Sequence, residues 1–273
     1  MVSIIREMLS FGFIVRALIV GISVSLCAAI LGVTLVLKRY SMIGDGLSHV
    51  SFGAMAIAIA FNFAPLQFSI PVVIASAFFL LKMSQNSKIN ADAAIALISC
   101  TSIAIGITVI SLNSGLNADI SNYMFGSILA LSQTDVYLSL GLSAIVIIMF
   151  FLSYNQIFTI TFDENFSKAT GVKVELYTMI LAFLTSITIV IGMSLMGTML
   201  ISSLVIFPGL SAMQVFKTFK LVVITSAIIS VVAFFVGTVI SYAFGLPTGA
   251  SVVLVNAASF IFLTLVKAIS RKI

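Results

Sequence analysis

An aspartate and a histidine stand four residues apart in the sequence, and together they could bind a metal ion. Asp45 and His49 lie within the stretch Gly-Asp-Gly-Leu-Ser-His-Val-Ser-Phe-Gly at positions 44–53, and His49 is the only histidine in the chain. Residues four apart on a helix share one face, so the carboxylate and the imidazole would lie side by side. An oxygen and a nitrogen ligand placed in this way can grip a divalent cation.

A purely structural explanation of the pair competes with ion binding. Asp45 would stand near the start of a helix, where a carboxylate is favoured, and His49 would be a buried, hydrogen-bonded side chain. We favour an ion pathway, because each charge inside a membrane costs about 2.5–3.5 kcal/mol and such residues are usually functional. Two ligands are few for Zn²⁺, which usually takes about four. A second copy of the chain, Ser48, backbone carbonyls or water would have to supply the others.

Composition indicates the surroundings of this pair. The chain is 61% hydrophobic and 8% charged, with a mean hydropathy of +1.29, whereas soluble domains average about 25% charged residues. Apolar runs of about 18–25 residues recur, which is the length of a membrane-spanning helix. The net charge of +5 comes from Lys and Arg in short loops, which indicates membrane topology rather than nucleic-acid binding.

The sequence therefore predicts an all-α integral membrane protein with one permease domain, residues 1–273, and eight to nine transmembrane helices. Gly197, Pro208 and Gly209 predict a kink or break in the seventh segment, and whether that segment crosses fully decides between eight and nine spans. The expected helices cover about 13–37, the stretch after Asp45–His49 to about 62, 68–81, 91–112, 135–152, 175–192, 194–216, 221–244 and 250–266.

The distribution of basic residues predicts the orientation in the membrane. If the N-terminus is outside, 11 of the 13 basic residues fall in one compartment, all except Arg6 and Arg16. Basic loops stay in the cytoplasm, so the N-terminus is expected outside and the C-terminus inside. The basic residues on the expected cytoplasmic side are Lys38, Arg39, Lys82, Lys88, Lys168, Lys173, Lys217, Lys220, Lys267, Arg271 and Lys272.

A short helix of about 162–170 is expected in the longest polar connection, which this topology places in the cytoplasm. Thr161-Phe-Asp-Glu164 has the form of a capping box, and Asp163 and Glu164 would occupy the first turn. Gly171 can end the helix. Phe166 would be an exposed apolar side chain, which favours docking of a soluble partner over a merely solvated loop.

The chain lacks the signatures of the common nucleotide-using enzymes. It has no Walker A glycine–lysine pair, and Gly44-x-Gly46 lacks the rest of a dinucleotide fingerprint. We therefore expect a transport subunit and not an enzyme, with energy supplied by another chain or by an ion gradient.

Four stretches resemble the permease subunits of zinc/manganese ABC importers, and the resemblance spans about residues 13 to 270. The most specific is Arg-Tyr-Ser-Met-Ile-Gly-Asp-Gly-Leu-Ser-His at 39–49. The others are similar to the family's mid-chain motif at 122–129, its coupling helix at 162–171, and its late membrane motif at 197–209, which contains Ser202, Ser203 and Pro208.

The resemblance implies a multi-pass permease of the bacterial plasma membrane that acts as a homodimer. Its partners would be two cytoplasmic ATPase subunits and an extracytoplasmic metal-binding protein, besides the membrane lipid; no nucleic acid is involved. Zn²⁺ or Mn²⁺ would be transported cargo met by Asp45 and His49, with no permanently bound cofactor. In the coupling helix, Phe166 would enter an ATPase groove, Ala169 would allow close contact, and Asp163 or Glu164 would meet basic residues before Gly171 ends the helix.

Two other functions remain open at this point. A permease for siderophores, haem or cobalamin would belong to the same broad class, although such chains are usually longer and need a wider pathway. A metal carrier driven by an ion gradient would work without an ATPase. Asp/His ligation suits Zn²⁺, Mn²⁺ and Fe²⁺ alike.

Overall fold

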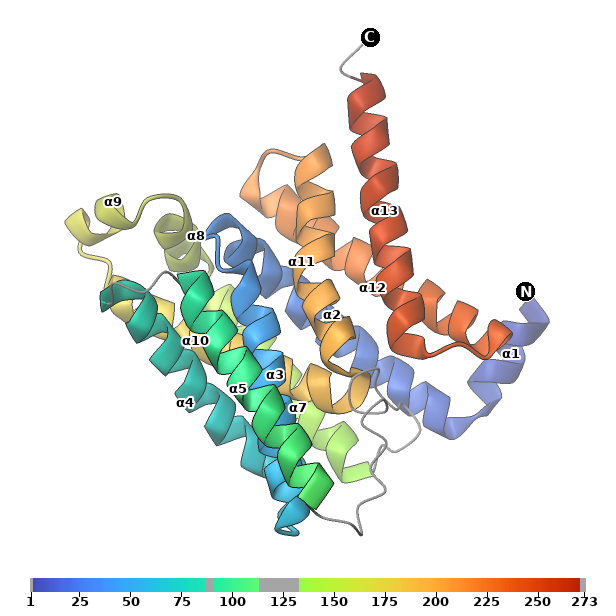
Figure 1. Ribbon diagram of the computed structural model, residues 1–273. Helices are drawn as coiled ribbons and strands as arrows, with labels where there is room; N and C mark the ends of the chain where they lie inside the picture. Colours follow the sequence, from blue (N-terminus) through green and yellow to red (C-terminus); the bar gives the residue numbers. More distant parts are fainter. Residues whose placement is uncertain (1, 87–90, 113–132, 271–273) are drawn as a thin grey trace.

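The computed structural model describes residues 2–86, 91–112 and 133–270, and within these ranges the chain forms helices and no strands (Figure 1). Nine of the described helices are long and apolar enough to cross a membrane, which confirms the predicted all-α membrane bundle. The segment around Pro208 is one of the nine. These helices are α2 (Gly12–Leu37), α3 (Ser41–Ala60), α4 (Pro65–Asn86), α5 (Ala91–Leu112), α7 (Gln133–Leu152), α10 (Val174–Met196), α11 (Thr198–Val215), α12 (Phe219–Phe244) and α13 (Thr248–Ser270).

Helices α2, α3, α10 and α11 form the centre of the bundle. Helix α2 packs against α11, α12 and α10, and α3 contacts α5, α4, α11 and α10. Helix α13 lies against α11 and α12 and presents one side away from the bundle (Figure 1). A preceding short helix, α1 (Val2–Ser10), packs against α2 and α12.

Helix α3 begins earlier than the sequence predicted. It starts at Ser41, because the turn after α2 is completed within three residues. Arg39 adopts a left-handed backbone conformation (φ 60°), and the Tyr40 N–H closes the turn by donating to the Leu35 carbonyl at 2.8 Å. Asp45 therefore lies in the second turn and not at the helix start, and His49 lies about 12 Å along the axis at 1.5 Å per residue.

The seventh expected segment is interrupted at Gly197, one of the residues from which a break or kink was predicted. Helix α10 continues to Met196, and Gly197 (φ 83°) separates it from α11, which starts at Thr198 and contains Pro208 in its interior. The break is therefore at a glycine that adopts a positive φ without steric cost, and the proline is accommodated within the helix.

The connection after α7 contains two helices where the sequence predicted one. Helix α8 (Tyr154–Phe162) packs Ile157 and Ile160 into the core, and α9 (Glu164–Ala169) follows. The predicted capping box is wrong: Thr161 lies inside α8 and donates to the Ile157 carbonyl, whereas Asp163 caps α9. The mid-chain motif at 122–129 and the residues Lys88, Arg271 and Lys272 lie outside the described residues.

Candidate metal-ion site

Asp45 and His49 face each other on one side of α3, as their spacing predicted. The distance from Asp45 Oδ2 to His49 Nε2 is 3.5 Å. This is longer than a charge-assisted N–H···O bond, which is about 2.7–2.9 Å. Two ligands of one tetrahedral ion, each about 2.0–2.2 Å from it, would lie roughly 3.3–3.5 Å apart. The spacing of the two atoms therefore suits a shared cation.

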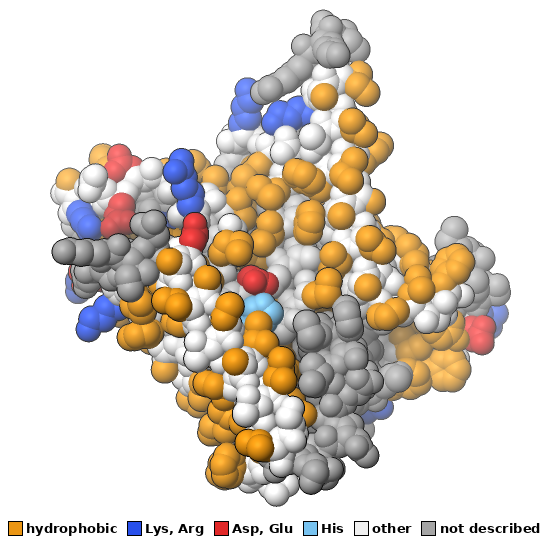
Figure 2. All heavy atoms as spheres, in the orientation of Figure 1, with side chains coloured by type: hydrophobic (Ala, Val, Ile, Leu, Met, Phe, Trp, Pro, Cys, Tyr) orange, Lys and Arg blue, Asp and Glu red, His pale blue; other side chains and the backbone are white. Residues whose placement is uncertain are grey.

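The pair is accessible from one face of the molecule. The Asp45 side chain is 39% exposed and that of His49 is 19% exposed. Figure 2 shows the single histidine beside an acidic side chain, surrounded by apolar side chains. An ion could therefore reach the two ligand atoms without the core being opened.

A second helix contributes to this site. Ser202 on α11 donates its hydroxyl proton to Asp45 Oδ1 at 3.0 Å. No role was predicted for Ser202, since nothing in the local pattern around residue 202 identifies a partner on α3. Its only signal was membership of the late membrane stretch 197–209.

Ser48, a candidate for an additional ligand, bonds within its own helix. Its Oγ donates to the backbone carbonyl of Asp45 at 2.7 Å, and the side chain is fully buried. Within the described part of the chain, no group of three or more His, Cys, Asp and Glu residues could hold a metal ion. Among the described residues of one copy of the protein, the candidate metal ligands at this site are therefore the Asp45 carboxylate and the His49 imidazole.

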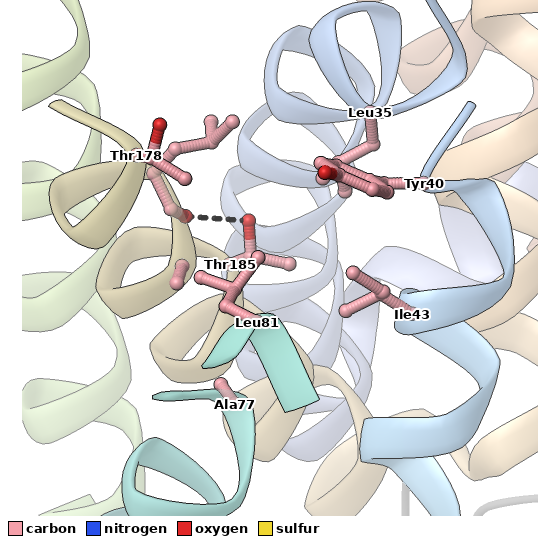
Figure 3. Close-up of a pocket in the computed structure, with 9 residues that line it drawn as sticks. Leu35, Tyr40, Ile43, Ala77, Leu81, Thr178 and Thr185 are labelled. Atoms are coloured by element: carbon pink, nitrogen blue, oxygen red, sulfur yellow. Dashed lines mark hydrogen bonds between the residues drawn. The ribbon is translucent and has the colours of Figure 1, made fainter. Parts of the chain in front are cut away.

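A separate recess lies near the start of α3, and neither Asp45 nor His49 lines it. It lies between α2, α3, α4 and α10, and its lining is almost entirely apolar (Figure 3). Of its two threonines, Thr185 donates to the Leu181 carbonyl at 2.7 Å. The lining residues are Leu35, Tyr40, Ile43, Ala77, Leu81, Thr178, Leu181, Ala182 and Thr185.

The remaining predicted site residues gather on α9, at one edge of the bundle (Figure 1). Asp163 accepts the Phe166 N–H at 2.8 Å and so caps the helix. Glu164 and Lys168 form an ion pair at 3.0 Å. Phe166 is 58% exposed, and Ala169 is also exposed. The structure thus presents an ordered surface with an apolar side chain at its centre.

The end of α9 is fixed as predicted. Gly171 has φ 84°, and its N–H donates to the Lys168 carbonyl at 3.2 Å. The Val172 N–H donates to the Ser167 carbonyl at 3.0 Å, which completes a Schellman motif. Because Gly171 needs a positive φ, a residue with a side chain there would be strained.

Two contacts that the sequence did not reveal join α8 and α9 to the bundle. Phe219, at the start of α12, packs against Phe158 and Phe162 of α8, with ring centroids 5.3 and 6.0 Å apart. Lys38, just after α2, lies near α9: burial lowers the pKa of its ammonium group, and the nearby Glu164 carboxylate opposes that shift. Phe219 thus links α8 to the start of α12, and the Glu164 carboxylate of α9 acts electrostatically on Lys38 at the end of α2.

Comparison with known proteins decides the family. The sequence profile of the ABC 3 transport family matches residues 10–267. The chain belongs to the ABC 3 transport family. This membership confirms the resemblance drawn from the sequence and the prediction of a membrane transport subunit that is not an enzyme.

Relatives in this family agree over nearly their whole length. The manganese transport system membrane protein MntC of Halalkalibacterium halodurans is 27% identical, over 93% of this chain and 87% of its own. The zinc uptake system membrane protein ZnuB of Haemophilus influenzae is 27% identical, over 92% of this chain and 96% of its own. The solved structure of PsaBC from Streptococcus pneumoniae, in complex with Fab, superposes with a TM-score of 0.86 at 28% identity, covering 96% and 94% of the two chains.

Proposed function

We propose that this chain is the membrane permease subunit of an ATP-driven importer for Mn²⁺ or Zn²⁺. The observation that carries the proposal is the Asp45–His49 pair, whose facing atoms are 3.5 Å apart on a central helix. The family and the named cargo of the relatives support the same class of ion. In this function the metal ion is cargo, and no permanently bound cofactor is needed.

The pair would bind the ion transiently during transport. Carboxylate oxygens suit Mn²⁺ and imidazole nitrogens suit Zn²⁺, so this pair of ligands can accept either ion. With two protein ligands per copy, water or a second copy of the chain must complete the coordination. Incomplete coordination suits a transporter, because a site that binds too tightly would hold its cargo and slow release.

We place the N-terminus outside and the C-terminus in the cytoplasm of the bacterial plasma membrane, as the basic residues indicate. In this orientation α9 faces the cytoplasm and receives an ATPase subunit, with Phe166 in its groove, Ala169 in close contact and the acidic Asp163 and Glu164 beside it. An extracytoplasmic metal-binding protein delivers the ion to the opposite face. Two copies of the single permease domain, residues 1–273, then alternate between outward-open and inward-open states as the ATPases close.

The test is metal uptake by proteoliposomes that contain the permease with its ATPase. We expect His49→Ala and Asp45→Ala each to reduce uptake of radiolabelled Mn²⁺ or Zn²⁺ by at least about 100-fold, since loss of a ligand should cost no less than loss of its supporting partners. Both variants should still co-purify with the ATPase. Asp92→Ala, which removes an exposed carboxylate from the neighbouring α5, is the matched control and should keep uptake.

Three outcomes would contradict the proposal. Undiminished uptake in both α3 variants would show that Asp45 and His49 do not form an ion site. Uptake by liposomes holding the chain without ATPase would indicate a gradient-driven carrier, and uptake restricted to a metal chelate would indicate a chelate permease.

A further inference from the structure

Ser202 makes a side-chain hydrogen bond to the Asp45 carboxylate across a helix interface. Its Oγ donates to Oδ1 at 3.0 Å, while Oδ2 of the same carboxylate faces His49. The two oxygens of Asp45 thus have different neighbours: one is held by α11, and the other points at the second ligand.

The backbone around Ser202 is held firmly enough to orient that carboxylate. Val205, one turn further along α11, packs against α2 so closely that a Cβ on Gly32 would lie 2.0 Å from the Val205 carbonyl oxygen. A Cβ on Gly44 would be in ordinary contact with the Val205 side chain, at 3.5 Å. Helix α11 therefore packs against both α2 and α3 beside Asp45, and these contacts hold the backbone at Ser202 in place.

The neighbouring serine shows the alternative that Ser202 does not take. Ser203 donates to the Leu200 carbonyl of its own helix at 3.0 Å. Serines inside helices commonly satisfy their hydroxyl in this way. Ser202 instead bonds to a carboxylate on another helix, and a carboxylate that can rotate about its terminal torsion gains a fixed orientation from such a bond.

We propose that Ser202 is a positioning residue for ion binding: it holds Asp45 so that Oδ2 and His49 Nε2 face the same cation. This inference rests on the proposed function of the pair. Hydrogen-bond partners of metal-ligating side chains typically contribute 10–100-fold to metal affinity. Because Ser202 itself is not assigned as a ligand, its removal should weaken binding without abolishing it.

The test measures Mn²⁺ affinity and uptake on the same permease–ATPase complex. We expect Ser202→Ala to raise the Mn²⁺ dissociation constant and the half-saturating concentration for uptake by about 10-fold or more, with the maximal rate changed less than about twofold. Ser202→Thr keeps the hydroxyl and should restore most of the affinity. Ser203→Ala, the matched control, should change neither quantity.

The outcomes separate this inference from the function on which it rests. If Asp45→Ala loses Mn²⁺ binding while Ser202→Ala binds like the parent or more tightly, the positioning role is wrong and the ion site stands. If Asp45→Ala binds Mn²⁺ normally, the ion site itself is wrong. Should Ser202→Ala fail to assemble, Ser202→Cys, of similar size but a weak donor, takes its place with the same expected loss and the same contrary result.

Discussion

Central and peripheral helices of this protein differ sharply in what covers them, even where their mean hydropathy is the same. In the most apolar 18-residue stretch of each, α2, α3 and α10 bury 72%, 72% and 78% of residues, whereas α5, α7 and α13 bury 22%, 28% and 11%. The central α2 and α10 have mean hydropathies of 2.5 and 2.2, close to the 2.3 and 2.2 of the peripheral α5 and α13, and the central α3, at 1.3, is less apolar than any of these. Lipid and protein interior both accept apolar side chains, so hydropathy alone cannot tell which of them a helix faces.

Glycines mark the closest helix contacts, including one on the peripheral α5, where a Cβ on Gly106 would lie 2.7 Å from the Phe52 ring. A Cβ on Gly32 of α2 would lie 2.0 Å from the Val205 carbonyl oxygen, and one on Gly53 of α3 would lie 2.7 Å from the Ser102 carbonyl oxygen. A Cβ on Gly141 of the peripheral α7 would meet nothing within 4 Å. Where helices must approach closely, as they do around Asp45, glycine is needed at the contact.

The largest effect is expected at the contact between α2 and α11. Gly32→Ala puts a methyl group against backbone that cannot move aside, which typically costs 1–3 kcal/mol. We expect the apparent Tm of the purified protein to fall by about 5–10 °C, together with metal uptake. Gly141→Ala should leave Tm unchanged or slightly higher, because alanine favours a helix. Equal shifts in the two variants would show that the central and peripheral helices are not packed differently.

A second prediction distinguishes two kinds of exposed phenylalanine. Phe166 on α9 is 58% exposed and Phe262 on α13 is 64% exposed, but α9, with six residues, is too short to span a membrane. Lipid can cover Phe262, whereas under the proposed function an ATPase subunit covers Phe166. We expect Phe166→Ala to lower ATP-coupled uptake by about 10-fold, equivalent to about 1.4 kcal/mol of lost docking, or to release the ATPase on purification.

Phe262→Ala is the control and should retain uptake and ATPase binding. Coupled flux unaltered by Phe166→Ala would count against docking at α9. Loss of flux in the Phe262 variant would instead make α13 more than a lipid-facing helix.

The smallest effect is expected at a polar contact between a central and a peripheral helix. Lys267 of α13 donates to Gln214 Oε1 of α11 at 2.9 Å. Because the two side chains are partly exposed, Gln214→Ala should cost about 0.5–1.5 kcal/mol and lower Tm by about 1–4 °C, with metal uptake preserved. A large loss of uptake would show that the position of α13 matters to transport.

The parts of the fold that local patterns encode were predicted, and the parts that depend on packing were not. Apolar runs predicted eight to nine membrane helices, and nine helices of the described ranges are long and apolar enough to span. Four-residue spacing placed Asp45 beside His49. The start of α3 was missed because Arg39, a residue that seldom adopts a positive φ, closes the turn after α2. Thr161 matched the local pattern of a helix cap, but α8 continues past it to Phe162. Burial of Ile157 and Ile160 in the core stabilises α8, and this tertiary effect is not visible in the local pattern.

The candidate site was half predicted for the same reason. Asp45 and His49 lie on one helix, so their proximity follows from helical geometry. Ser202 reaches the same carboxylate only because α11 packs against α2 and α3 at Gly32 and Gly44. Phe219 against α8 and Lys38 near α9 are likewise contacts between distant segments, which a single sequence does not reveal.

The distance in sequence between Ser202 and Asp45 has a consequence for biosynthesis. The two residues are 157 positions apart, so a ribosome working at 5–20 residues per second makes the serine roughly 8–30 s after the aspartate. During that interval the Asp45 carboxylate lacks the hydrogen bond from Ser202 of α11. His49, made four residues later, is the first partner that the nascent chain can offer the acid.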